Sequence, residues 1–132
     1  MLTHVRFLAD DIAPDVAFYR DVMGLPQVVD VPGVYAEFDA GAVRLAFYRR
    51  DLMAGVVGAA SGGSGGCVVC LRVASVDAEA ARLAARGLLL LTTPHDQAAW
   101  HQRVAHLRDA AGRLVELWSP LRAAPAAPET TT

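Results

Sequence analysis

Residues 59–66, with the sequence AASGGSGG, divide the chain into two halves that repeat one order of elements. The stretch holds only Ala, Ser and Gly, so it has nothing large and apolar to bury and is expected to be a flexible connector. We expect a βαβββ unit on each side, at residues 1–58 and 67–120. Residues 121–132 are rich in Ala, Pro and Thr and are expected to form a frayed tail.

The first half predicts a strand, a helix and three further strands. Residues 2–9 suit a strand, after which Asp10 or Asp11 can cap a helix with Pro14 in its first turn and Gly24 at its exit. Turn sequences at Pro32-Gly33 and 39–41 then separate the remaining strands, which are expected at residues 27–31, 34–39 and 42–49.

The second half repeats this order. A strand at 68–74 precedes an Asp77 cap and a helix through residues 78–86, with Gly87 at its exit, and the three further elements are expected at residues 88–92, 103–108 and 113–118. The loop at residues 94–102 is longer than its counterpart in the first half, and long loops often carry function. The predicted fold class is α+β, with curved mixed sheets.

Composition excludes several classes of protein. A length of 132 residues suits a single core rather than a large multi-domain enzyme, and a net charge of −2 lacks the basic excess that nucleic-acid binding needs. No run is long and apolar enough to cross a membrane, and residues 1–11 do not resemble a signal peptide, so we expect a cytoplasmic protein. Cys67 and Cys70 should point to opposite faces of a strand, which favours two small apolar residues over a zinc or redox site.

Several stretches are similar to motifs of a known family. These are HVRF at 4–7, Asp10, AFYRDVMGL at 17–25, WHQRVAHLRD at 100–109 and GRLVELW at 112–118. They resemble the first strand and helix and the last hairpin of the vicinal oxygen chelate superfamily, which includes glyoxalase I, bleomycin-resistance proteins and extradiol dioxygenases. The resemblance extends over residues 1–120. It implies paired βαβββ units around a ligand cavity, and a homodimer, but it does not select one activity.

The resemblance also implies a candidate metal site. It places His4 at the first ligand position and Glu116 at the last, and an imidazole with a carboxylate suits Fe, Zn, Ni or Mn. The other two positions, near Val69 and within residues 42–49, carry no such donor except Cys70. A third ligand could come from the remaining histidines, His95, His101 and His106. Alternatively, His4 is a polar residue facing the cavity and Glu116 pairs with an arginine.

Aromatic residues indicate a binding pocket. Trp118 and Leu114 share a strand face with Glu116 because side chains alternate along a strand. Trp100, Tyr35 and either Phe47 or Tyr48 could complete an apolar, partly aromatic wall, although Phe47 suits the core beneath a helix better. His106 could serve as an acid or base if it faces the cavity, or be an ordinary hydrogen-bonded histidine.

Three functional hypotheses follow. The first is a glyoxalase-like enzyme, a lyase, isomerase or dioxygenase, that handles a small oxygenated organic molecule with a divalent metal held by His4 and Glu116 as catalytic residues. The second is a metal-free binding protein that sequesters an antibiotic-like compound in the aromatic pocket. The third is a dimer without a ligand.

Overall fold

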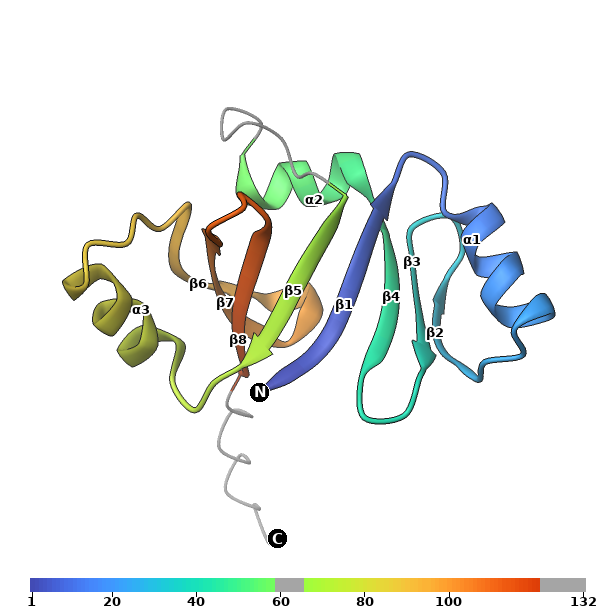
Figure 1. Cartoon of the computed structure of the whole chain (residues 1–132), viewed down its shortest axis with the longest axis horizontal. Coiled ribbons are helices and arrows are strands. Elements are labelled where there is room, and N and C mark those ends of the chain that lie inside the picture. Colours follow the sequence, from blue (N-terminus) through green and yellow to red (C-terminus); the bar gives the residue numbers. More distant parts are fainter. Residues whose placement is uncertain (59–65, 122–132) are drawn as a thin grey trace, which may run out of the picture.

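The computed structural model describes residues 1–58 and 66–121, which form one mixed sheet of eight strands in the order β2-β3-β4-β1-β5-β8-β7-β6. Each half contributes four neighbouring strands, and helices accompany the sheet, so the predicted α+β fold class is confirmed (Figure 1). The strands are β1 (Leu2–Ala9), β2 (Gln27–Val31), β3 (Tyr35–Asp39), β4 (Arg44–Arg49), β5 (Cys67–Arg72), β6 (Thr92–Gln97), β7 (Gln102–Arg108) and β8 (Leu114–Pro120).

The two halves join at the middle of the sheet. β1 and β5 pair antiparallel, with His4 opposite Cys70 and Arg6 opposite Val68. β1 also pairs parallel with β4, and β5 pairs parallel with β8, where Cys70 lies opposite Glu116. The first strand of each half is therefore central. Side chains from both halves lie next to one another on a common face of the sheet.

Helices lie on both faces of the sheet. α1 (Ala13–Ala17), which continues into the π-helical turn η1 (Phe18–Val22), lies at one end of the sheet in Figure 1, and α3 (Val76–Ala85) lies at the other. The N-cap of α1 is Ile12, without a side-chain cap, rather than the predicted Asp10 or Asp11, although Asp11 accepts a hydrogen bond from the Ala13 amide at 3.0 Å. The cap of α3 is Ser75, which accepts from Ala78 at 3.1 Å, rather than the predicted Asp77.

Two apolar clusters hold these layers together. On one face, α2 (Arg50–Val57) packs against the central strands through Leu8, Met53, Val57, Val68, Cys70 and Leu114. On the other face, α1 covers β3 and β4 through Ile12, Ala36, Phe38 and Phe47. Burial of a large apolar side chain contributes about 1.5–3 kcal/mol, so these clusters are the main source of stability.

The structure differs from the sequence prediction in two elements. The sequence analysis did not predict α2, and the second strand of the second half is β6, at Thr92–Gln97 rather than 88–92. β6 contains Pro94, which an edge strand tolerates because the missing amide breaks no ladder within the sheet. Of the predicted connector at 59–66 and the predicted tail at 121–132, residues 59–65 and 122–132 lie outside the described residues.

Candidate functional site

A row of polar side chains crosses the face of the sheet that α2 covers. The strand register aligns His4 of β1, Cys70 of β5, Glu116 of β8 and His106 of β7. Arg6 lies two residues after His4 on β1, so it projects to the same face. Both halves of the chain therefore supply ionisable groups to one side of one sheet.

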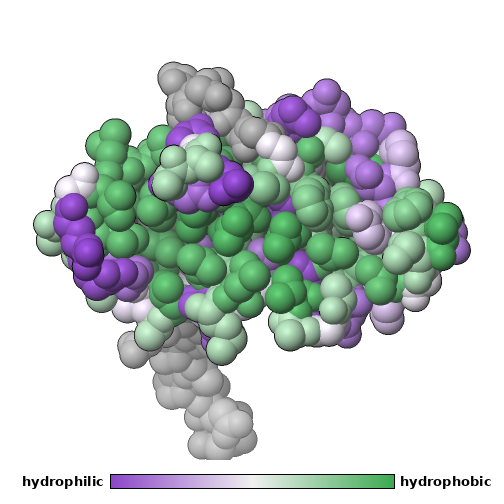
Figure 2. Space-filling model, viewed as in Figure 1, coloured by the Kyte–Doolittle hydropathy of each residue, from purple (hydrophilic) through white to green (hydrophobic). Residues whose placement is uncertain are grey.

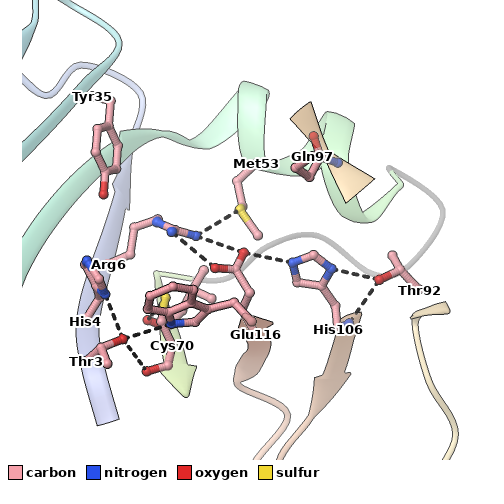
Figure 3. Close-up of polar contacts among 12 residues, drawn as sticks. Thr3, His4, Arg6, Tyr35, Met53, Cys70, Thr92, Gln97, His106 and Glu116 are labelled. Carbon is pink, nitrogen blue, oxygen red and sulfur yellow. Dashed lines mark hydrogen bonds and ion pairs between the residues drawn. The ribbon is translucent and has the colours of Figure 1, made fainter. Parts of the chain in front are cut away.

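Arg6 and Glu116 form a buried ion pair. Arg6 Nη1 and Nη2 donate to the two carboxylate oxygens of Glu116 at 3.1 and 3.2 Å, and the two residues are 6% and 0% exposed (Figure 3). Burial alone would raise the pKa of Glu116, but the charge of Arg6 and the hydrogen bonds outweigh it and lower the pKa to about 2. Burial likewise disfavours the charged form of Arg6, yet Glu116 raises its pKa above the ordinary value. Both groups are charged in the folded protein.

His106 extends this pair towards the edge of the sheet. Its Nε2 lies 3.0 Å from Glu116 Oε1, and its Nδ1 lies 2.8 Å from Thr92 Oγ1, which also accepts from the His106 amide at 2.9 Å. Because a carboxylate only accepts, Nε2 carries the proton, and a neutral ring then accepts the Thr92 hydroxyl at Nδ1. Arg6, Glu116, His106 and Thr92 are called the buried relay below.

A second polar group lies on β1 and β3. His4 Nε2 is 3.2 Å from Glu37 Oε1, and the Tyr35 hydroxyl donates to the same oxygen. Burial alone would raise the pKa of Glu37, but the hydrogen bonds from His4 and Tyr35 lower it below the ordinary value, whereas burial raises the pKa of Tyr35. The side chains of His4 and Glu37 are each 16% exposed, so this group, called the cavity carboxylate group below, still reaches solvent.

The two polar groups meet at a cavity of about 330 Å³. The guanidinium carbon of Arg6 lies 5.5 Å from the ring centre of Trp100, 5.9 Å from that of Tyr35 and 6.0 Å from that of Tyr48. The lining consists of His4, Arg6, Val29, Val31, Val34, Tyr35, Glu37, Tyr48, Ala99, Trp100 and Gln102. The cavity thus combines aromatic and aliphatic walls with a few polar groups, as small-molecule sites do.

One buried donor of Arg6 has no partner. Arg6 Nε is buried and makes no hydrogen bond within the described residues, while the two other guanidinium nitrogens are held by Glu116. An unpaired buried donor costs about 1–3 kcal/mol.

The residues predicted to form the site are divided among different places. His4, Tyr35 and Trp100 line the cavity. Trp118 lies beside a neighbouring hollow and donates from Nε1 to Thr3 Oγ1 at 2.9 Å. Two others belong to the core: Leu114 packs beneath α2, and Phe47 lies on the opposite face, beneath α1.

Sequence reasoning missed Arg6 and Glu37 as site residues, whereas Tyr48, which it offered as an alternative to Phe47, lines the cavity. Alternation along β1 already places Arg6 on the same face as His4, and an arginine among apolar strand residues is an unusual occupant of an interior face. The partners of Arg6 could not be inferred in the same way, because Glu116 is 110 residues away in sequence.

Comparison with known proteins identifies the family. A model of the Glyoxalase/Bleomycin resistance protein/Dioxygenase superfamily matches residues 1–117. The chain belongs to this superfamily. One relative is the Bacillus subtilis protein YraH, described as uncharacterized, which is 32% identical over 126 residues. The alignment covers 91% of this chain and 98% of YraH.

Solved structures agree with this membership. A Streptomyces coelicolor methylmalonyl-CoA epimerase in complex with 2-nitronate-propionyl-CoA is 25% identical, with a TM-score of 0.67 over 94% of this chain and 97% of that chain. A hypothetical protein from Bacillus halodurans is 18% identical, with a TM-score of 0.68 over 95% of this chain and 97% of that chain, which supports the fold alone.

Many members of the superfamily bind a divalent metal, and the donors of this chain do not fit one. Both oxygens of Glu116 already accept hydrogen bonds from Arg6, and a divalent cation there would meet the charge of the guanidinium. His4 is held instead by Glu37 and Thr3. Across residues 1–58 and 66–121, no group of three or more His, Cys, Asp or Glu side chains could hold a metal. Arg6 supplies the positive charge that neutralises Glu116.

Of the three histidines considered as a third ligand, His95 and His106 are hydrogen-bonded to other groups and His101 is exposed. His95 contacts the Thr93 carbonyl at 2.9 Å and Gln97 at 3.0 Å. His101 is exposed, at the end of the short helix η3 (Ala98–Trp100). His106 is fully buried within the relay, on the face of β7 opposite Arg103, which pairs with Asp77 of α3.

Proposed function

We propose that this protein binds a small organic molecule in the 330 Å³ cavity without a metal. The observation that carries the proposal is the engagement of both Glu116 oxygens by Arg6, which removes the carboxylate expected to hold a metal and leaves the guanidinium in the cavity wall. The rings of Tyr35, Tyr48 and Trp100 supply contact area for a ligand. This corresponds to the binding-protein hypothesis, in which an antibiotic-like compound is sequestered.

The metal-dependent hypothesis requires a different arrangement of the same residues. A lyase, isomerase or dioxygenase with His4 and Glu116 as ligands of Fe, Zn, Ni or Mn would require Arg6 to leave Glu116. Arg6 would then lose the carboxylate that compensates its burial, which is strongly unfavourable. Elemental analysis separates the hypotheses: we expect far less than one transition metal per chain, and stoichiometric metal that Glu116→Gln removes would refute the proposal.

A matched pair of tryptophan variants tests the cavity. Chelator-treated protein is titrated calorimetrically with 2-acetylnaphthalene, a planar molecule that the cavity walls suit. Trp100→Leu should weaken binding about tenfold or more, because Trp100 lines the cavity. Trp118→Leu, outside that lining, is the control and should leave the affinity unchanged. Absence of binding by the wild-type protein, or equal losses in both variants, would contradict the proposal.

We propose a homodimer formed through the central strands. Figure 2 shows apolar surface gathered over the middle of the molecule, where Figure 1 places β1 and β5 between α1 and α3. Phe7 of β1 is 38% exposed, and its ring stacks on Phe47 at the border of the α1 cluster. Phe7→Glu should convert dimer to monomer in light scattering. A wild-type protein that is already monomeric would contradict the proposal.

The predicted cytoplasmic location remains a proposal. Among the described residues, no helix is long and apolar enough to cross a bilayer. Cys67 and Cys70 are both free thiols, which is consistent with a reducing compartment. Fractionation of cells that express the protein would test the location.

A further inference from the structure

The hollow beside Trp118, called the outer hollow below, lies at the end of the sheet where β1 begins. We propose that it binds the anionic group of an organic molecule, a carboxylate or a phosphate, between Arg44 of β4 and Arg72 of β5. The outer hollow has a volume of about 520 Å³, and its lining includes both arginines and Trp118. This site lies beside the cavity, and the inference does not depend on the proposed binding function.

The strand register brings Arg44 and Arg72 to the same face of the sheet. Arg44 lies opposite His4 of β1, and His4 lies opposite Cys70, which is two residues before Arg72 on β5. Figure 1 shows the end of β5 beside the start of β1, at the edge of the sheet away from α2. Because β4 and β5 flank β1, they are about 10 Å apart, and two long arginine side chains can reach one anion between them.

The guanidinium groups of Arg44 and Arg72 are available to a ligand. Within residues 1–58 and 66–121, neither group makes a hydrogen bond or an ion pair, whereas Arg6, Arg49 and Arg103 each pair with a carboxylate. Arg72 is exposed and Arg44 is half-buried, and both line the outer hollow, so an anion can reach them from solvent. Two guanidinium groups without carboxylate partners offer several donors to one oxyanion.

Trp118 holds Arg72 without using its donors. The Arg72 guanidinium carbon lies 5.3 Å from the ring centre of Trp118, and Trp118 Nε1 donates to Thr3 Oγ1 at 2.9 Å. A guanidinium over an aromatic ring keeps the N–H groups in its own plane free for an anion. This contact reduces the conformational entropy that Arg72 would lose when it binds a ligand.

The charges of the outer hollow favour an anion. Its described lining contains two arginines and one carboxylate, that of Glu37, which already accepts from His4. The cavity differs, because Arg6 is the one arginine in its described lining and Glu116 neutralises it. Leu2 and Val28, which are 40% and 44% exposed, add apolar contact area to the outer hollow. The occupant should therefore be an organic anion rather than an inorganic one.

Three naphthalenes test this inference by calorimetric titration: 2-naphthoate carries a carboxylate, 2-naphthyl phosphate carries a phosphate, and 2-acetylnaphthalene is neutral. Arg44→Gln and Arg72→Gln should each weaken binding of the anions about fivefold or more, because each change removes charge-assisted hydrogen bonds, and should leave binding of the ketone unchanged. The tighter of the two anions identifies the group that the outer hollow prefers. Arg86→Gln is the matched control and should change neither affinity, because Arg86 is exposed at the end of α3, outside the outer hollow.

Two measurements on the wild-type protein do not depend on how the variants fold. An increase in NaCl from about 0.1 to 1 M shortens the Debye length from about 10 to 3 Å, so it should weaken binding of the anions and not that of the ketone. The chain has two tryptophans, which give separate indole N–H resonances in NMR spectra. 2-Naphthoate should shift the resonance of Trp118, in the outer hollow, more than that of Trp100, in the cavity.

The outcomes distinguish this inference from the proposed function. Binding of either anion that both arginine variants weaken, and that Arg86→Gln does not, would support the anion site. Failure of both anions to bind, equal losses in Arg86→Gln, or a larger shift at Trp100 would overturn it and leave the proposed function intact. Failure of the ketone alone would overturn the proposed function and leave the anion site intact.

Discussion

The buried relay and the cavity carboxylate group place the same chemistry in different surroundings. Each combines a carboxylate with a histidine and a hydroxyl, and both lie on one face of one sheet. Glu116 is fully buried with both oxygens engaged by Arg6, whereas Glu37 reaches solvent through the cavity. The comparison indicates that Glu116 holds the two halves together and positions Arg6, while Glu37 sets the charge that a ligand meets.

Removal of Arg6 should have the largest effect on the folded protein. Arg6→Ala leaves Glu116 charged and buried without its main partner, which should cost about 3–5 kcal/mol in the free energy of unfolding measured with urea. Arg20→Ala is the control, because Arg20 and Asp21 form an exposed pair that should contribute no measurable stability. A loss below about 1 kcal/mol in Arg6→Ala would show that the relay is not structural.

Acid should destabilise the protein through Glu116. Because the pKa of Glu116 is lowered from 4.5 to about 2 on folding, the unfolded chain binds its proton more readily than the folded chain. The stabilisation from this carboxylate is complete above pH about 4.5 and is lost as the pH falls towards about 2. Urea unfolding at several pH values should show that the difference between wild type and Glu116→Gln shrinks over this range. A constant difference would contradict the ion pair.

Substitution of Glu37 should affect stability least. Glu37→Gln keeps an oxygen that can accept from Tyr35, and the site reaches solvent, so the loss should be about 1 kcal/mol or less. The same change removes the negative charge of the cavity lining. Binding of 2-naphthoate should therefore improve relative to 2-acetylnaphthalene in calorimetry. A large loss of stability, or an unchanged ratio of the affinities for 2-naphthoate and 2-acetylnaphthalene, would contradict the distinction between the buried relay and the cavity carboxylate group.

The repeat predicted most of the fold because its signals are local. Strand alternation, turn residues and the glycines after the helices recur in both halves, and they located seven of the eight strands approximately. β6 was displaced because Pro94 and His95 are typical of a loop, and only its position at the sheet edge makes Pro94 acceptable as a strand residue. α2 begins directly after β4, and no turn sequence marks the change.

The candidate site was harder to predict because its decisive contact is not local. The sequence placed His4 and Glu116 on strands of the two halves, and also allowed that Glu116 pairs with an arginine. The structure shows that this arginine is Arg6, which the register of β1 and β5 brings across the junction to β8. No periodic pattern reveals which of twelve arginines lies opposite a given carboxylate.

The most direct test of the account is a calorimetric titration of 2-acetylnaphthalene into chelator-treated protein, with and without added Fe, Zn, Ni or Mn. The account predicts binding of the same affinity in every case, because Arg6 already provides the fixed positive charge beside Glu116. Binding that appears only after a metal is added would contradict it and would restore His4 and Glu116 as metal ligands.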